Sequence, residues 1–146
     1  MYEANLLQPI HTTAELLERY AKGKRGFMGA ELGEADLEGA KLRGTDLSYA
    51  DLRGAKLGYA NLRGADLSYT DLGEANLCEA DLRGANLIGA NLIGARLRGA
   101  NLIGADLIGA RLRTSYYDEN TLFPDGFDPV SAGMRTEVME IAKWQL

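Results

Sequence analysis

The chain has 146 residues, 46% of them hydrophobic, a length that suits a single domain. Its formal net charge is −5, and this acidity argues against direct binding to nucleic acid, which favours basic proteins. A single cysteine excludes an internal disulfide. We find neither a signal peptide nor an apolar run of about 18 residues, the minimum for a membrane-spanning helix. These features predict a cytoplasmic protein without a membrane partner.

The first segment, residues 1–25, carries the signals of one helix. Thr12 and Glu15 have the spacing of a capping box, in which the threonine hydroxyl accepts a hydrogen bond from the glutamate amide. An apolar stripe follows, formed by Leu16, Leu17 and Tyr20. Gly23 suits the end of such a helix. The pattern predicts a helix over about 13–22 that covers the first turn of the next segment.

Residues 26–114 repeat every five residues. Leucine occupies each fifth position from Leu32 to Leu112, seventeen times without a gap, and Phe27 has the same phase one step earlier. Two positions before each leucine lies a small residue, which is alanine at all but two steps. A helix repeats after about 3.6 residues and a strand after about 2, so neither can bury every leucine. A chain that turns one corner per repeat can, and four corners close a coil of twenty residues.

Each repeat then divides into an inner and an outer part. The leucine and the small residue share one phase of a strand and point inward, whereas the other three residues point outward. Glycine is frequent at the second position after the leucine, which suits a corner with a positive φ.

The repeat resembles a known family. Segments such as Ala50-Asp51-Leu52-Arg53-Gly54 and Ala85-Asn86-Leu87-Ile88-Gly89 match the A(D/N)LXX pattern of pentapeptide-repeat proteins. This resemblance implies an all-β solenoid, the right-handed quadrilateral β-helix of that family, to which we add short helical caps at both termini. Residues 117–129 also resemble the C-terminal segment of many cyanobacterial members.

The last segment, residues 115–146, is a tail with an acidic bias. Two of the three prolines lie within it and predict an irregular loop. Apolar residues at helical spacing then predict a short helix over Met134–Trp144.

Residues twenty apart stack on one side of the predicted solenoid, so its surface forms columns. One column holds Arg43, Arg63, Arg83 and Ile103. A second column holds Glu31, Asp51, Asp71, Asn91 and Arg111, and a third holds Asp46, Asp66, Asn86 and Asp106. The arginine column is either a site for an anion or an acidic partner or a solvated face paired with neighbouring carboxylates. The acidic columns either bind a cation or imitate DNA phosphates, or they are a structural feature of the repeat.

Two further features are candidates for an interaction surface. Tyr49 and Tyr69 stack one coil apart, which suits either a binding hot spot or a ladder that only stabilises the fold. Four isoleucines occupy outward positions in the C-terminal coils: Ile88, Ile93, Ile103 and Ile108. Such an apolar patch needs a cover. We expect the tail to cover at least one of these faces, the alternative being a homodimer through the C-terminal half or a partner protein.

Catalytic chemistry is not expected. The single histidine, His11, precedes the repeat, and Cys78 points outward, so neither a nucleophilic pair nor a zinc site is indicated. The glycines lack the Lys-Ser/Thr partner of a phosphate-binding loop. We expect no enzyme, no cofactor and no metal, but an interaction module for an unidentified protein partner. The alternative is a DNA mimic that modulates a type II topoisomerase, a role known in the family, against which the short repeat and the arginine column count.

Overall fold

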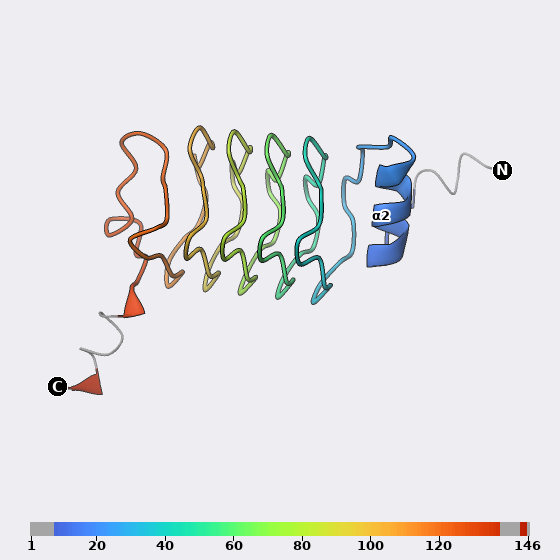
Figure 1. The fold of residues 1–146 in the computed structure, drawn as a ribbon. Helices are drawn as coiled ribbons and strands as arrows, with labels where there is room; N and C mark the ends of the chain where they lie inside the picture. The colour runs from blue at the N-terminus through green and yellow to red at the C-terminus, as the bar shows by residue number, and fades with distance from the viewer. Residues whose placement is uncertain (1–7, 138–143, 146) are drawn as a thin grey trace.

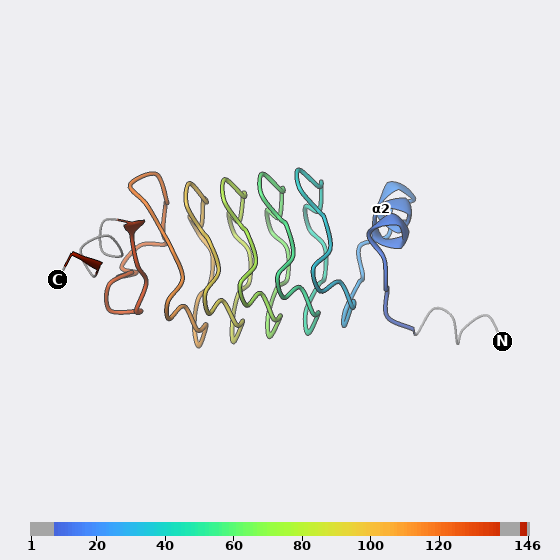
Figure 2. The ribbon, with the colours of Figure 1, turned by 90° about the horizontal axis from the view of Figure 1, so that it is seen from below.

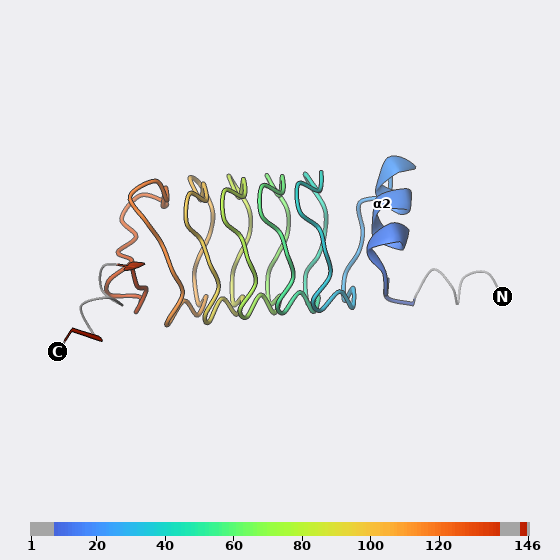
Figure 3. The same ribbon diagram turned by 60° about the horizontal axis from the view of Figure 1, so that its bottom comes forward.

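A computed structural model that describes residues 8–137, 144 and 145 shows a stack of coils with α2 at one end (Figure 1). Parallel bridges join residues twenty apart, as in Asp46 to Asp66 and Asp51 to Asp71, and they form four ladders around each coil. The coils keep an even spacing along one axis in two other views (Figure 2, Figure 3). The chain is therefore a β-helical solenoid, and the predicted period of twenty residues is confirmed.

Each side of a coil contains one bridge residue between two turns. In a representative repeat, the amide of Leu67 donates to Asn86 O at 2.7 Å and the amide of Tyr69 donates to Ile88 O at 2.9 Å. The amide of Thr70 closes the turn onto Leu67 O at 3.2 Å. The ladders consist of such isolated bridges, and no longer strands occur among the described residues. Because most amides bond to the next or previous coil, the stack is rigid along its axis.

The leucines fill the interior as predicted. From Leu32 to Leu102 each is at most 2% exposed, and the alanines two positions earlier are buried with few exceptions. Thr45 and Thr70 replace alanine in this row. Their hydroxyls donate to Leu42 O at 2.8 Å and to Leu47 O at 2.7 Å, so the two buried polar groups are satisfied.

Every turn places the second residue after the leucine at positive φ. Glycine occupies eleven of these eighteen positions, and φ there lies between 67° and 76°. The others are Glu34, Tyr49, Tyr59, Tyr69, Glu74, Glu79 and Thr114, with φ between 56° and 62°. The expected positive φ at the corner is confirmed.

Helix α2, Thr13–Ala21, covers the N-terminal end of the stack. Thr12 accepts a hydrogen bond from Glu15 N at 3.1 Å, as the capping box predicts. Gly23 has a φ of 88°, and the amide of Lys24 donates to Arg19 O at 3.0 Å, which completes a glycine-ended helix terminus. Leu16, fully buried, joins the core of the coils.

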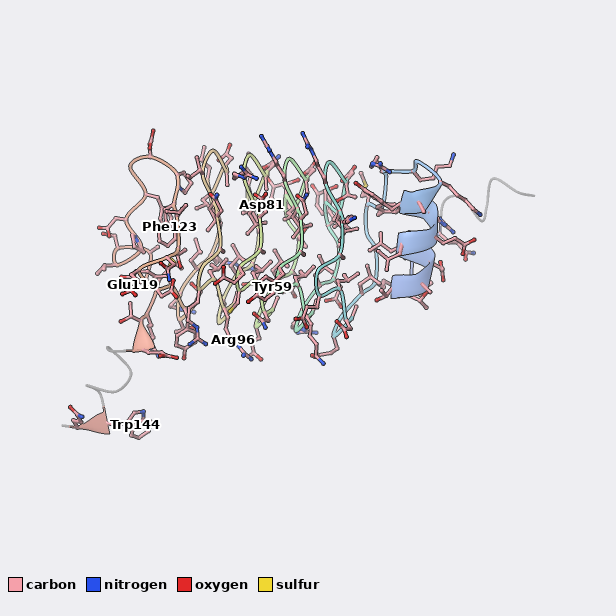
Figure 4. All side chains as sticks on the ribbon, in the orientation of Figure 1. Tyr59, Asp81, Arg96, Glu119, Phe123 and Trp144 are labelled. Atoms are coloured by element: carbon pink, nitrogen blue, oxygen red, sulfur yellow. The ribbon has the colours of Figure 1, made fainter. Side chains whose placement is uncertain are left out.

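The tail closes the other end of the stack. Asn101 bridges to Leu122, twenty-one residues later, and Tyr116 bridges to Arg135, nineteen residues later. Phe123 contacts Tyr117 edge-on at 5.7 Å between centroids and stacks on Phe127 at 5.1 Å. These rings pack against the core beyond the last repeat (Figure 4).

One carboxylate replaces a main-chain acceptor at this end. In the coils before it, the residue at the position of Gly99 donates to a carbonyl of the next coil. Gly99 N instead donates to the carboxylate of Asp118 at 3.0 Å. Partial burial raises the pKa of Asp118, but hydrogen bonds from Gly99, Asn120 and Thr121 outweigh it and hold that pKa below its ordinary value.

The predicted C-terminal helix begins too early. Met134 donates its amide to Pro129 O, and Arg135 forms a bridge, so both belong to the closing coil and not to a helix. Residues 138–143, which make up most of the predicted helix, lie outside the described residues. The structure therefore corrects the start of the helix and leaves the rest as a prediction.

Candidate interaction surface

The two residues after each leucine stack into four edges that run along the solenoid. We call one of them the tyrosine edge: Met28-Gly29, Ser48-Tyr49, Ser68-Tyr69, Ile88-Gly89 and Ile108-Gly109. The arginine edge contains Arg43-Gly44, Arg63-Gly64, Arg83-Gly84 and Ile103-Gly104. The other two edges, which begin at Gly33 and Glu38, carry acidic and basic residues in turn. Among these four edges within residues 28–114, the tyrosine edge alone has no charged residue.

Two tyrosines form the centre of this edge. The rings of Tyr49 and Tyr69 are 5.2 Å apart between centroids and 15° from parallel, a stacked pair. Tyr69 in turn lies over Gly89, where an added Cβ would come within 2.5 Å of Cε1 of the ring. A glycine at that position of the next coil therefore makes room for the ring.

The exposed apolar surface continues on both sides of the pair. The exposed fractions are 61% for Met28, 63% for Tyr49, 54% for Tyr69 and 72% for Ile108. Ile88, between them, is half-buried. At a coil spacing of about 4.8 Å, five such positions extend over about 20 Å. Met28 belongs to this row, although the sequence analysis did not identify it. Its position twenty residues before Ser48 could have indicated that it lies on the same edge.

Carboxylates flank the tyrosine pair on both sides. Asp46 and Asp66 lie three residues before the tyrosines, and Asp51 and Asp71 lie two residues after them. Each aspartate uses Oδ1 for the amide two residues later, at 3.0 Å in all four cases. No hydrogen bond or ion pair among the described residues occupies their second oxygens. Each tyrosine is thus preceded and followed along the chain by an aspartate with an available acceptor oxygen. Asp46 and Asp66 bond to the serines beside the tyrosines, whereas Asp51 and Asp71 bond to residues 53 and 73 of the next edge.

The three arginines of the arginine edge differ in their ion pairs. Arg83 forms a two-point contact with Asp81, at 2.8 Å from Nε and 2.6 Å from Nη2. Hydrogen bonding to Arg83 lowers the pKa of Asp81, whose position on the rod Figure 4 marks. The side chains of Arg43 and Arg63 make no ion pair within the described part of the chain. The expected pairing with neighbouring carboxylates thus holds for Arg83 and not for the other two.

The four isoleucines lie on three edges. Ile88 and Ile108 share the tyrosine edge, Ile103 ends the arginine edge, and Ile93 lies on the edge beyond Ile88. Ile88 and Ile93 are half-buried, and Ala132 of the tail lines the same hollow as Ile93.

The other two isoleucines are exposed, 51% at Ile103 and 72% at Ile108, although Ile108 lines a hollow together with Pro124 and Phe127 of the tail. That the tail covers at least one isoleucine-bearing face stays a prediction, and the tail does not bury Ile103 or Ile108. The tail aromatics Tyr117, Phe123 and Phe127 pack against the core cluster.

Among the residues that the structure describes, the other polar groups lie apart from one another. The imidazole of His11 pairs with Glu31 at 3.0 Å in an exposed position. Cys78 is half-buried, and its amide donates to Asn76. A hollow of about 430 Å³ is lined by charges of both signs, including Glu34, Lys56 and Arg96. Within residues 8–137, 144 and 145, no group of three His, Cys, Asp or Glu side chains is placed to hold a metal ion.

The family profile for pentapeptide repeats matches eight copies, over residues 27–58, 45–84, 60–99 and 80–115. The chain belongs to the pentapeptide repeat family. The resemblance inferred from the A(D/N)LXX segments is therefore confirmed. No curated protein is similar enough to the chain to count as a match.

Several solved pentapeptide repeat proteins are similar to the chain. The protein alr5209 from Nostoc PCC 7120 is 49% identical over 88% of this chain and 98% of its own, with a TM-score of 0.53. HetL from Nostoc sp. strain PCC 7120 is 41% identical over 70% of this chain and half of its own, with a TM-score of 0.57. A protein from the Arabidopsis thaliana thylakoid lumen is 34% identical over 63% and 68%, with a TM-score of 0.53. No helix in the described part of the chain is long and apolar enough to cross a membrane.

Proposed function

We propose that this pentapeptide repeat protein is a non-enzymatic interaction module whose tyrosine edge binds a protein partner. The observation that carries the proposal is the absence of charge along that edge, together with the exposure of Met28, Tyr49, Tyr69 and Ile108. Tyrosine is enriched at binding hot spots, and contiguous exposed apolar residues are typical of interaction sites. For the finer shape of the scaffold, we infer the right-handed, four-sided β-helix that the family resemblance implies.

The two tyrosines adopt a strained backbone conformation. A non-glycine residue at positive φ costs about 1–2 kcal/mol, and glycine would relieve the cost. Tyr49 and Tyr69 nevertheless adopt φ values of 59° and 56°. Tyr59 and four other non-glycine turn residues share this conformation, so the strain alone does not distinguish the two rings, and the assignment rests on their stacking and exposure.

A regulatory role is compatible with such a surface. HetL, of which this chain spans half the length, is involved in heterocyst differentiation regulation. A protein without an active site can serve regulation by binding a partner. DNA mimicry is supported less well, because Arg43 and Arg63 interrupt the negative charge and because Asn86 and Asn91 break the acidic columns.

The test is a comparison of captured proteins. Immobilised wild-type protein, the double variant Tyr49→Ser/Tyr69→Ser and the control Tyr59→Ser are each exposed to an extract of the source organism. We expect a protein that the wild type and the control retain and the double variant loses. Equal retention by all three would contradict the assignment of the tyrosine edge. Light scattering on the same samples tests the alternative occupant, a second copy on the exposed isoleucines of the C-terminal half.

A further inference from the structure

We propose that the Tyr49–Tyr69 stack and the four aspartates around it form a binding site for arginine or lysine side chains of a partner's basic segment. The inference rests on the proposed function, since it describes the chemistry of the partner at the tyrosine edge. It is carried by a pair of nearly identical hexapeptides one coil apart, Asp46-Leu-Ser-Tyr-Ala-Asp51 and Asp66-Leu-Ser-Tyr-Thr-Asp71. Their bridges, Asp46 to Asp66 and Asp51 to Asp71, hold the two copies in register.

The aromatic part of the site has one open face. Tyr69 is covered by Tyr49 on one side and lies over Gly89 on the other. Tyr49 has Tyr69 on one side only, because Gly29, at the same position one coil earlier, has no side chain to cover the far face. A guanidinium or ammonium group over an open tyrosine face is attracted by the negative charge of the ring face, and arginine also stacks on it.

The acidic part of the site is already oriented. Oδ1 of Asp46 accepts hydrogen bonds from the amide and the hydroxyl of Ser48, at 3.0 and 2.6 Å, and Ser68 holds Asp66 in the same way. These bonds fix Asp46 and Asp66 at the serines that precede the tyrosines and leave the Oδ2 of each available to an incoming cation. Because the aspartates are half-buried, a cation bound between them is screened less by solvent than at a fully exposed pair.

Charge selects a basic partner over an acidic one. No lysine or arginine lies within either hexapeptide, and Glu31 extends the row that Asp51 and Asp71 form. An acidic segment would meet four like charges, which is unfavourable. A purely apolar segment would leave the four carboxylates without partners at the interface. The surface therefore fits a segment in which Lys or Arg alternates with apolar residues that contact Met28 and the isoleucines.

The chain contains its own matched control. Tyr59 has the same backbone conformation, with a φ of 60°, and is 67% exposed. It stands in the segment Lys56-Leu-Gly-Tyr-Ala-Asn61, however, and Glu79 follows it in the next coil. Tyr59 thus keeps the ring, the strain and the exposure but lacks both the stacked partner and the aspartates at the two ends of the hexapeptide.

The experiment measures the binding of short fluorescent peptides by anisotropy. In three probes Arg, Lys or Glu alternates with Leu. We expect the Arg and Lys peptides to bind and the Glu peptide not to bind. Tyr49→Ser should weaken binding of the Arg peptide about fivefold, as the loss of a cation–π contact with the open ring face implies, whereas Tyr59→Ser should leave it unchanged.

Charge variants complete the test. Replacing Asp46, Asp51, Asp66 and Asp71 by Asn keeps the turns, because Asn61 makes the same bond to Arg63 N at 3.1 Å. This variant should bind the Arg peptide at least about tenfold more weakly. The control changes Glu34, Glu38, Glu74 and Glu79 to Gln, which removes the same charge from the other edges and should weaken binding less than about threefold.

Three outcomes overturn the inference: no binding of the basic peptides, equal binding of the Glu peptide, or equal losses in the two charge variants. The proposed function fails separately, if Tyr49→Ser/Tyr69→Ser retains every protein that the wild type captures. If a captured protein depends on the tyrosines but the basic peptides do not bind, the proposed interaction module stands and its proposed preference for cations is wrong.

Discussion

The ring of Tyr49 stacks on that of Tyr69 from the next coil, with 5.2 Å between the centroids and 15° between the planes. Both residues adopt a backbone conformation that glycine occupies at most equivalent turns. The stack therefore combines two opposing contributions to stability: the strain of the positive-φ backbone, which is unfavourable, and the ring contact, which stabilises the fold by about 0.5–1.5 kcal/mol. Its effect on stability and its effect on binding are separable by substitution.

Glycine substitution separates the cost of the backbone strain from the stabilisation by the ring stack. Tyr59→Gly should raise the free energy of unfolding by up to about 1 kcal/mol, because it removes backbone strain and Tyr59 stacks on no ring. Tyr69→Gly should gain little or nothing, because the loss of the stack offsets the same relief. Denaturant titration of both variants checks this. A larger gain for Tyr69→Gly than for Tyr59→Gly would show that the stack does not stabilise the fold.

The turn glycine beneath Tyr69 offers a second comparison. Gly89→Ala and Gly44→Ala introduce the same strain, since φ is 67° and 70°. At Gly89 the new Cβ also meets the ring of Tyr69, whereas at Gly44 no atom lies within 4 Å. Both should lower the free energy of unfolding by about 1–2 kcal/mol, with an extra loss at Gly89. Near-ultraviolet circular dichroism should change for Gly89→Ala only; identical spectra would contradict the contact.

A central leucine tests the core. Leu67→Ala should lower the free energy of unfolding by about 2–5 kcal/mol, because the surrounding coils cannot collapse into the cavity. Leu67→Lys should not fold, since a buried charge has no partner there. Far-ultraviolet circular dichroism and thermal denaturation measure both, with the exposed Arg63→Ala as the control. A cooperatively folded Leu67→Lys protein would refute the interior position of this side chain.

Acid should weaken the C-terminal closure. The pKa of Asp118 is lower in the folded chain than its ordinary value, so its contribution to stability is complete above that ordinary value, about 3.9, and is lost as the pH falls through the folded pKa. Asp118→Asn should lose part of this acid dependence. Thermal midpoints measured between neutral pH and about pH 2 would show it as a smaller difference than in the wild type. Identical pH profiles would mean that the bond to Gly99 is not formed.

The tail should keep the molecule from associating through its end. Deleting residues 115–146 uncovers Leu107 and Leu112 and removes the bridges that Arg96 and Asn101 form with Tyr116 and Leu122, so that side of the last coil is left unpaired. Such edges pair with other chains, so light scattering should detect association that rises with concentration. The exposed Val130→Ser substitution serves as the control. A truncated protein that remains monomeric and equally stable would show that the end needs no cover.

The repeat region could be predicted because each side of a coil carries one leucine at the same position, and that leucine must point inward. With leucine inward at every fifth position, only one register buries the whole row. The tail was not predictable in the same way. The leucine phase ends at Leu112, so nothing indicated that Asn101 would pair with Leu122 instead of the residue twenty positions later.

The candidate surface was only partly predictable. The Tyr49–Tyr69 stack followed from their spacing of twenty residues and is confirmed by the ring geometry. The isoleucines suggested a C-terminal patch under the tail, but the exposed fractions show that Ile103 and Ile108 remain open. The five-residue spacing ends before the tail, so it does not reveal against which residues the tail packs.

The contacts at the two ends of the stack restrict which insertions or deletions the protein can accept. Helix α2 contacts one particular side of the first coil, through the bond from the hydroxyl of Tyr20 to Arg43 O at 3.2 Å, and the tail is fitted to one side of the last coil. An insertion of twenty residues preserves both relations and lengthens the tyrosine edge by one step. An insertion of five residues preserves the leucine period but turns one end cap by a quarter of a revolution relative to the other. Viable size variants of this architecture should therefore differ by whole coils, so that its length is a discrete quantity.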